Sequence, residues 1–236
     1  MTKLPYLISR LSFLASGLML LFINWSCIDA DESTSLLEEC DILNYRIYQG
    51  EQLTLGEVSR EFIFIGIDKS YTDEDISDFL QTQNFLDQGF NFTIHEDAQY
   101  QFKQIPVRLN RQRNCSEISV ILESLEGSDI VAYAHPTFET DDCQDAIGNP
   151  VGEQCVRVYV SSFFVRVPNP EELTALQELI ASTNTEWLGA NQFMSNWHEI
   201  RATKNSQGDA LEMANFFLQS GVVNAVDPGI GIYPVR

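Results

Sequence analysis

The sequence predicts an α+β fold made of two tandem split β-α-β domains of the ferredoxin-like type. A helix pattern that stops at a glycine and leads directly into an apolar strand occurs twice, about ninety residues apart. The segments around both copies follow the order β-α-β-β-α-β, which a single internal duplication explains. The chain has 236 residues, 44% of them hydrophobic, and so can bury one large core or two small ones.

The first half contains one complete β-α-β-β-α-β series. Its expected elements are a strand over 61–67, a helix over 72–86, a hairpin over 90–97 and 100–109, a helix over 115–127 and a strand over 130–136. Thr72 is suited to the N-cap of the first helix, and Gly127 to the end of the second. The last strand is expected to end at Pro136.

The second half repeats the series. Its expected elements are a strand over 161–167, a helix over 169–182, extended segments over 185–193 and 197–203 around a turn at 194–196, a helix over 208–220 and a strand over 222–226. The first helix has three start signals: Asn169 as N-cap, Pro170 at the first helical position and Glu172 in a capping box.

The last helix has the clearest pattern. Its buried face is expected from apolar residues at i, i+3, i+4, i+7 and i+8, namely Ala210, Met213, Ala214, Phe217 and Leu218. Ser206 and Asp209 can cap its start, and Gly221 suits the left-handed conformation that ends a helix. Pro228 is expected to stop the pairing of the strand that follows.

The amino terminus has the features of an export signal. Lys3 and Arg10 precede an apolar run over 11–23, which is too short to span a membrane but suits a signal-peptide core. Ser26 then precedes Cys27, and this resembles a bacterial lipoprotein signal, in which the cysteine is acylated. The resemblance implies lipid anchoring at Cys27 to a bacterial outer membrane, on its periplasmic or cell-surface face. A plain secretory signal with a chance cysteine is the alternative.

The chain is strongly acidic. Its formal net charge of −20 becomes −22 without residues 1–26, because that segment contains two basic residues and no acid. Such a charge repels nucleic acid and anionic lipid, so we expect no nucleic-acid partner and membrane contact through the lipid alone. The acids are scattered along the chain, which favours a solubilising surface over an acidic recognition tail.

The remaining cysteines predict two disulfides. With Cys27 set aside, an exported chain keeps an even number: Cys40, Cys115, Cys143 and Cys155. Three pairings are open. We prefer Cys143 with Cys155, because turn-forming residues lie between them, which leaves Cys40 with Cys115. The sequence has no Cys-x-x-Cys, and its histidines lie far from the cysteines, so we expect no metal and no cofactor.

The expected domain organisation follows from these features. It is a signal peptide over 1–26, a tether over 27–45, a first domain over 46–140, a disulfide-pinned excursion over 141–158 and a second domain over 159–236. The oligomeric state is left open.

Catalytic motifs are missing from the sequence. It contains no G-x-S-x-G elbow, no H-E-x-x-H and no phosphate-binding glycine loop. Glu171 and Glu172 fit a helix start, His135 a strand end, and His198 a solvent-facing strand position. We therefore predict that the protein is not an enzyme. An unrecognised enzyme would need carboxylates with raised pKa in a cleft.

Three segments carry a family resemblance: "EELTALQELIASTNTEW", "GDALEMANFFLQSG" and "VVNAVDP". Together they resemble the amino-terminal prodomains of secreted subtilisin-like (S8) serine proteases, particularly Bacteroidetes members with two such modules before the catalytic domain. The resemblance covers 161–230 and, more weakly, 60–138. The family's blocks around the catalytic aspartate, histidine and serine do not occur. The resemblance implies a propeptide-like fold without the catalytic domain.

The resemblance also implies a partner. We expect this protein to bind a secreted subtilisin-like protease as inhibitor or folding partner; the alternative is a structural or adhesive surface-display protein without a protease partner. In the family an extended tail enters the protease cleft, where strand addition can hold it. The matching residues here are Gly229, Ile230, Gly231, Ile232, Tyr233, Pro234, Val235 and Arg236. A frayed terminus is the alternative for this segment.

Overall fold

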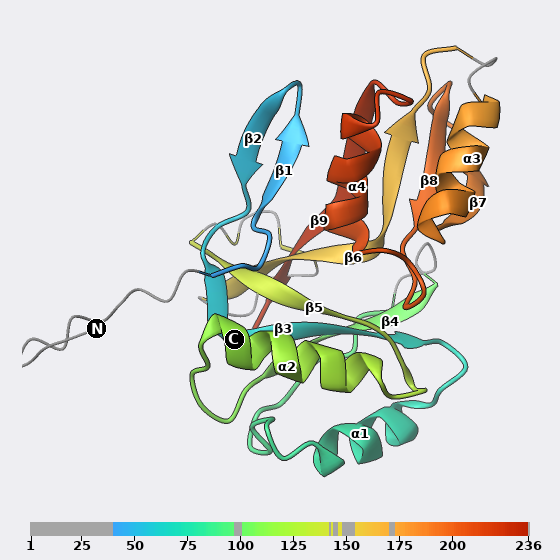
Figure 1. Cartoon of the computed structure of the whole chain (residues 1–236). Coiled ribbons are helices and arrows are strands. Elements are labelled where there is room, and N and C mark those ends of the chain that lie inside the picture. Colours follow the sequence, from blue (N-terminus) through green and yellow to red (C-terminus); the bar gives the residue numbers. More distant parts are fainter. Residues whose placement is uncertain are drawn as a thin grey trace, which may run out of the picture. The chain divides into compact units, whose positions relative to one another are not determined.

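Strands from both halves of the chain form a common antiparallel sheet (Figure 1). The computed structural model describes residues 40–96, 101–141, 143, 146–147, 154–169 and 173–235. Its elements are β1 (Tyr45–Tyr48), β2 (Glu51–Thr54), β3 (Val58–Asp68), α1 (Asp73–Thr82), β4 (Phe102–Arg108), α2 (Cys115–Glu126), β5 (Val131–Thr140), β6 (Cys155–Arg166), α3 (Leu173–Thr183), β7 (Glu186–Ala190), β8 (Trp197–Arg201), α4 (Ala210–Gln219) and β9 (Ala225–Pro234). The α+β class predicted from the sequence is confirmed.

Each half has the strand order of a split β-α-β unit. The second half runs β7-β8-β6-β9, with the first and last strands of the unit side by side. The first half runs β4-β3-β5, and the segment expected to form its outer strand meets β4 through one bridge, His95 to Gln104. The hairpin expected over 90–97 and 100–109 is therefore wrong, because its first segment pairs with β4 at this bridge alone among the described residues. Phe92 and Ile94 anchor that segment by packing on the core, with little backbone pairing.

The two halves are not separate sheets. Near the junction β5 pairs with β6, with Phe138 opposite Arg157 and Thr140 opposite Cys155. β6 therefore begins inside the stretch expected to be an excursion. The β1–β2 hairpin, which comes before the first unit in sequence, packs on α4 of the second, where the Asn215 side chain bonds the backbone of Tyr45 and of Ile47. The chain from Glu38 to Arg236 is thus one compact unit.

Two prolines expected to end strands lie inside them. Pro136 is opposite Ile63 within β5, and Pro228 is opposite Phe163 within β9. Each lies beside a register shift in the pairing. A proline lacks the N–H that a regular ladder needs, and an irregularity removes that requirement. Both strands therefore continue, and this continuation joins the halves.

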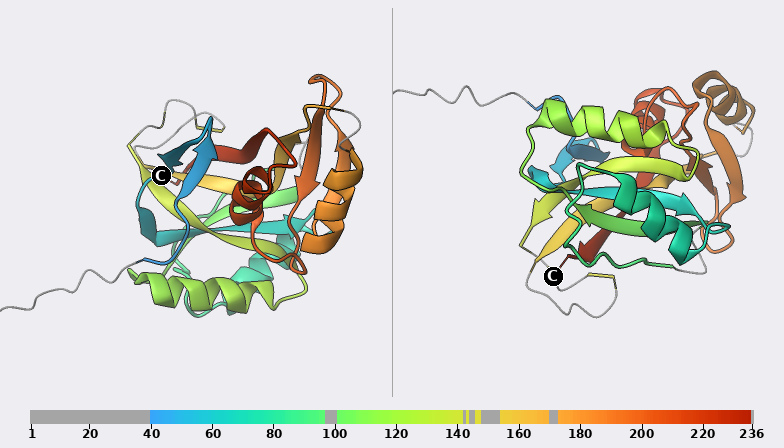
Figure 2. Two further views of the ribbon diagram at one scale, coloured as in Figure 1. Left: turned by 45° about the horizontal axis from the view of Figure 1, so that its top comes forward. Right: turned by 90° about the horizontal axis from the view of Figure 1, so that it is seen from below.

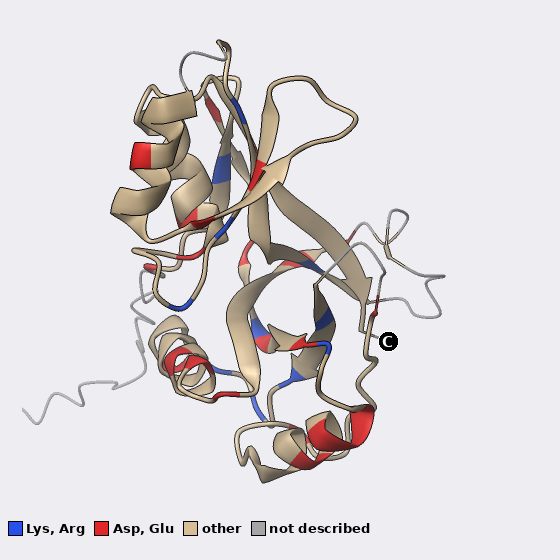
Figure 3. Ribbon diagram, turned by 90° about the vertical axis from the view of Figure 1, so that its right-hand side faces the viewer, with Lys and Arg blue, Asp and Glu red and all other residues tan. Residues whose placement is uncertain are grey.

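The sheet buries an apolar cluster on each of its faces. The described helices lie against the sheet (Figure 2). On the helix-covered face, Ile63, Ile65 and Ile67 of β3 belong to the main core, together with residues of all four helices that the structure describes. The alternate residues of β3 point the other way, into a second cluster. Its buried members are Phe62, Phe64, Tyr133, Val156, Val158, Val160, Tyr233 and Val235. These residues come from both halves. The strands that carry them curve around a shared interior (Figure 3).

The expected helix-end signals at Thr72, Asp209 and Gly221 are confirmed, whereas Ser206 bonds the backbone of Thr203 and Asn184 and does not cap α4. Thr72, Asn114 and Asp209 are the N-caps of α1, α2 and α4, and each forms a capping box with an acid three residues later. Gly221 follows α4 with a φ of 75°. The expected cap residues of α3 other than Asn169 lie outside the described residues. Within the described residues, no helix is long and apolar enough to cross a membrane.

Both expected disulfides are present. Cys40 is bonded to Cys115, with 5.4 Å between their Cα atoms, and Cys143 to Cys155, with 5.7 Å. The first ties the chain before β1 to the start of α2, and the second fixes the junction to the start of β6. Both constrain the unfolded chain, which stabilises the native state.

Gly66 of β3 provides a test of the second cluster. A Cβ built at Gly66 would lie 2.0 Å from Cε1 of Tyr133, whose ring is buried. We expect Gly66→Ala to lower the free energy of unfolding by about 2 kcal/mol, because the ring or the strand must move. Urea denaturation measures this change. Gly89→Ala is the control, since its nearest atom would be 3.4 Å away; equal stability of the two variants would contradict the packing described.

Candidate functional site

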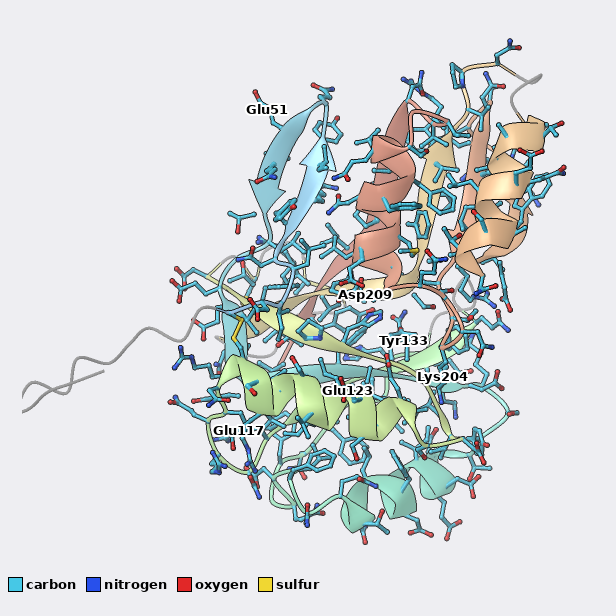
Figure 4. The ribbon with its side chains drawn as sticks, in the orientation of Figure 1. Glu51, Glu117, Glu123, Tyr133, Lys204 and Asp209 are labelled. Atoms are coloured by element: carbon cyan, nitrogen blue, oxygen red, sulfur yellow. A yellow bond between two sulfur atoms is a disulfide. The ribbon has the colours of Figure 1, made fainter. Side chains whose placement is uncertain are left out.

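A cleft of about 390 Å³ lies between the two halves. Residues of α2 and β5 form one side, and the β8–α4 connection with the start of α4 forms the other. We call it the junction cleft. Glu123, Tyr133, Lys204 and Asp209 all lie around it (Figure 4). Because its two sides come from different halves, no part of the sequence alone could show it.

Asp209 is fixed at the centre of this site by its role as N-cap. Its Oδ1 accepts from the backbone N–H groups of Leu211 at 2.8 Å and Glu212 at 2.9 Å. Its Oδ2 accepts from the hydroxyl of Tyr159 at 2.6 Å. These three donors hold the Asp209 carboxylate in one position at the amino terminus of α4. Asp209 is therefore a fixed negative charge beside the cleft.

His135 is a buried wall residue of the cleft and not the strand-end residue expected from the sequence. It is 3% exposed, and its ring lies between those of Tyr133 and Tyr159, with centroid distances of 4.7 and 4.2 Å. Its Nδ1 lies 2.8 Å from the carbonyl oxygen of Tyr159. A carbonyl only accepts, so Nδ1 carries the hydrogen and Nε2 presents a lone pair. Burial lowers the pKa of His135, which favours this neutral form.

Two carboxyl groups of the cleft have raised pKa values. Burial raises the pKa of Glu126, and the negative charge of Asp209 raises it further. Burial and then the charge of Asp209 also raise the pKa of Glu212. Burial raises the pKa of the Tyr159 hydroxyl well above its usual value, and the negative charge of Asp209 raises it further. Several acidic groups therefore lie close together in the cleft and are partly buried.

The cleft offers mainly hydrogen-bond acceptors. The amine of Lys204 donates to the backbone oxygen of Ser128 at 2.6 Å. Of the serines that line the cleft, Ser119 donates to the Cys115 carbonyl at 3.2 Å and Ser206 to the Asn184 carbonyl at 2.9 Å, so both hydroxyls have backbone partners. No group of His, Cys, Asp and Glu in the described residues is arranged to hold a metal ion. A ligand rich in N–H donors fits this chemistry best.

A second surface is the uncovered face of the sheet in the second half. On this face Phe164 and Arg166 of β6 lie opposite Glu199 and Trp197 of β8. The guanidinium of Arg166 lies 5.9 Å from the Trp197 ring centroid. The opposite face packs on the described helices, with Phe163 against Phe217 of α4. We call this surface the open sheet face, defined by Phe164, Arg166, Leu188, Trp197 and Glu199.

The predicted partner-binding tail is not free, which corrects the sequence-based expectation. Residues 229–234 belong to β9 and pair with β6, where Ile230 is opposite Tyr159 and Pro234 is opposite Cys155. Tyr233 is 1% exposed and Val235 is 5% exposed. The tail is retained because its apolar side chains complete the second cluster and its backbone completes an edge of β6. Arg236 lies outside the described residues.

The remaining candidates have different outcomes. The proposed lipidation residue, Cys27, lies outside the described residues, as do Glu171 and Glu172. His198 is 8% exposed, so the expected solvent-facing position is wrong. It packs edge-on to Trp187, with 5.5 Å between ring centroids. Sequence patterns identified Asp209 only as a helix cap and gave no sign that it meets His135 and Glu126.

Comparison with known proteins shows no family. No family model and no curated protein matches this chain. Among solved structures, the chain is similar to the small subunit of acetolactate synthase from Thermotoga maritima. That likeness has 13% sequence identity and a TM-score of 0.24, and it covers 73% of this chain and 94% of the other. A likeness at this level supports no conclusion about function, and the resemblance to protease prodomains stays a prediction.

Removal of the tail tests its structural role. We expect deletion of residues 229–236 to lower the free energy of unfolding by at least about 3 kcal/mol, because it takes Tyr233 and Val235 out of the second cluster. Thermal and urea denaturation, or loss of soluble protein, would report this. A frayed terminus would be removed at no cost, so an unchanged melting temperature would contradict the β9 pairing.

The raised pKa of Glu126 predicts a pH effect. Between the unfolded pKa near 4.5 and the higher folded value, the folded state holds more protons than the unfolded state. Stability attributable to this group therefore falls as pH rises through that window. We expect Glu126→Gln to be more stable than the parent at pH 8 and equally stable at pH 4, by urea denaturation. Glu51→Gln is the matched control; the opposite sign for Glu126→Gln would contradict the assignment.

Proposed function

We propose that this protein is a non-catalytic envelope protein that docks on a secreted subtilisin-like protease through its open sheet face, as inhibitor or folding partner. The observation that carries the proposal is an uncovered, partly aromatic sheet face on the unit whose sequence resembles the prodomains. The proposed lipid at Cys27 would hold the protein at the outer membrane, beside exported proteases.

The chemistry of the open sheet face favours protein recognition. Trp and Arg are the residues most enriched among interface hot spots, and Trp197 and Arg166 lie side by side on this face. Phe164 is half-buried between them and β9, and Leu188 of β7 is exposed. Such a face combines apolar contact area with charges that fix orientation.

The position of the tail changes the expected mode of action. A segment paired in β9 is not available to enter a protease cleft as a strand. Binding through the face would instead stabilise the folded protease by mass action, since a partner that binds only the native state favours it. Inhibition would then come from covering the enzyme surface.

The rival function, structural or adhesive display without a protease, has one observation in its favour. Phe193 is 95% exposed in the β7–β8 connection, and its neighbour Met194 is also exposed. An exposed aromatic residue at a hairpin tip suits contact with another surface. This tip is separate from the open sheet face and allows the two functions to be distinguished.

The test combines the protein from residue 27 onward with a panel of secreted subtilisin-like proteases. We expect micromolar or tighter binding to at least one protease, with slowed activity or faster refolding of that protease. Phe164→Ala with Trp197→Ala should weaken binding about tenfold or more, because both remove apolar contact at the centre of the face. Phe193→Ala is the control and should bind normally.

Two results would overturn the proposal. One is the absence of binding to every protease of the panel at micromolar concentration. The other is binding that is lost in Phe193→Ala but kept in the double variant, which would support display through the hairpin tip. Circular dichroism of each variant separates loss of binding from loss of fold.

A further inference from the structure

We propose that the junction cleft is a binding site for a guanidinium group, presented by a small molecule or by an arginine side chain. The site is separate from the open sheet face and does not depend on the proposed function. Its binding residues are Glu126 of α2, His135 of β5 and Glu212 of α4, with Asp209 as the fixed charge behind them.

The acceptors come from both sides of the cleft. Glu126 lies on one side and Glu212 on the other, and Asp209 interacts electrostatically with both. One oxygen of Glu126 is near the Ala134 N–H at 3.5 Å, and one oxygen of Glu212 accepts from the Asp209 N–H at 3.1 Å. Each carboxylate has a second oxygen for which the described residues supply no hydrogen bond, so both can accept from a ligand.

His135 is the independent observation that points to a ligand. Its side chain is almost completely buried, lines the cleft, and uses Nδ1 to donate to the Tyr159 carbonyl. The other ring nitrogen, Nε2, is left as an acceptor with no hydrogen-bond partner among the described residues. Nε2 itself is not sealed from solvent, so it opens on the cleft that His135 lines, where an N–H donor of a ligand can bond it.

The net negative charge of the lining favours a cationic ligand. Among the described residues that line the cleft, the acids are Asp41, Glu123, Glu126, Asp209 and Glu212. The basic lining residue is Lys204, whose amine is held on the Ser128 carbonyl. Its positive charge acts on Glu126, whose pKa is raised first by burial and then by the charges of Asp209 and Glu123. A bound cation would relieve the remaining repulsion among the carboxylates.

Guanidinium is the cation that fits these acceptors. A metal ion needs converging ligands, and the described residues contain no such group. A guanidinium is planar, carries five N–H donors and is more weakly hydrated than an ammonium. Its donors point in several directions within one plane, so it can bond more than one acceptor of the lining at a time. A cleft of about 390 Å³ has room for it and a short aliphatic chain.

The first experiment compares small probes by calorimetry at constant ionic strength and pH 7.5. We expect n-butylguanidinium to bind with millimolar or lower Kd, n-butylammonium to bind more weakly, and N-butylurea not to bind. N-butylurea is the neutral, planar counterpart of n-butylguanidinium and so isolates the effect of charge. Equal binding of the guanidinium and the urea would overturn the proposal.

The second experiment uses matched carboxamide variants. Glu126→Gln and Glu212→Gln should each weaken n-butylguanidinium binding about tenfold or more, since each removes a charge-assisted hydrogen bond. Gln can still accept the backbone bond at either position, so folding should be kept. Glu51→Gln, on β2 and away from the cleft (Figure 4), is the control and should bind like the parent.

A third arm identifies the source of the group. A short peptide with a central arginine and its citrulline counterpart are compared with n-butylguanidinium. Tighter binding of the arginine peptide would assign the cleft to a partner's side chain, whereas exclusion of the peptide with binding of the small probe would assign it to a free metabolite-sized cation. No binding of any guanidinium at 10 millimolar, or binding unchanged in both Gln variants, would overturn the proposal.

Discussion

The structure depends on the continuous pairing of β6 and β9 across both halves. The first part of β6 pairs with β5, its last part pairs with β8, and β9 runs along its other edge. An antiparallel ladder of this length fixes the relative orientation of the two split units. The backbone can continue through Pro228 because the register shift there removes the need for its missing N–H.

The curvature that this pairing imposes creates the second apolar cluster. Tyr233 of β9 brings its hydroxyl to Gln104 of β4, and its ring lies 4.8 Å from that of His95. Residues far apart in sequence thus close around one interior, and the tail becomes part of the core. Partner binding as proposed above would therefore use the open sheet face and not the tail.

The same pairing places the polar groups of the junction cleft. His135 is held against the carbonyl of Tyr159 because β5 and β6 are neighbours, and the Tyr159 hydroxyl in turn meets the cap of α4. A helix cap, which ordinarily serves its own helix, therefore acts here as a charge in an interface between units. The crowding of Glu126 and Glu212 around Asp209 follows from this geometry, and it is maintained by the stability of the sheet.

The sequence by itself determined the local structure: helix starts at Thr72 and Asp209, the repeated unit, and the Cys143–Cys155 disulfide, whose choice left Cys40 with Cys115. These follow from hydrogen bonds, periodicity and turn residues that lie close together in the chain. Tertiary structure alone decided that the prolines lie within strands, that the tail is buried, and that His135 faces the cleft. Each of these three features depends on which strand edges and sheet faces are left available by strands far away in the sequence. A local sequence pattern carries no information about those distant strands.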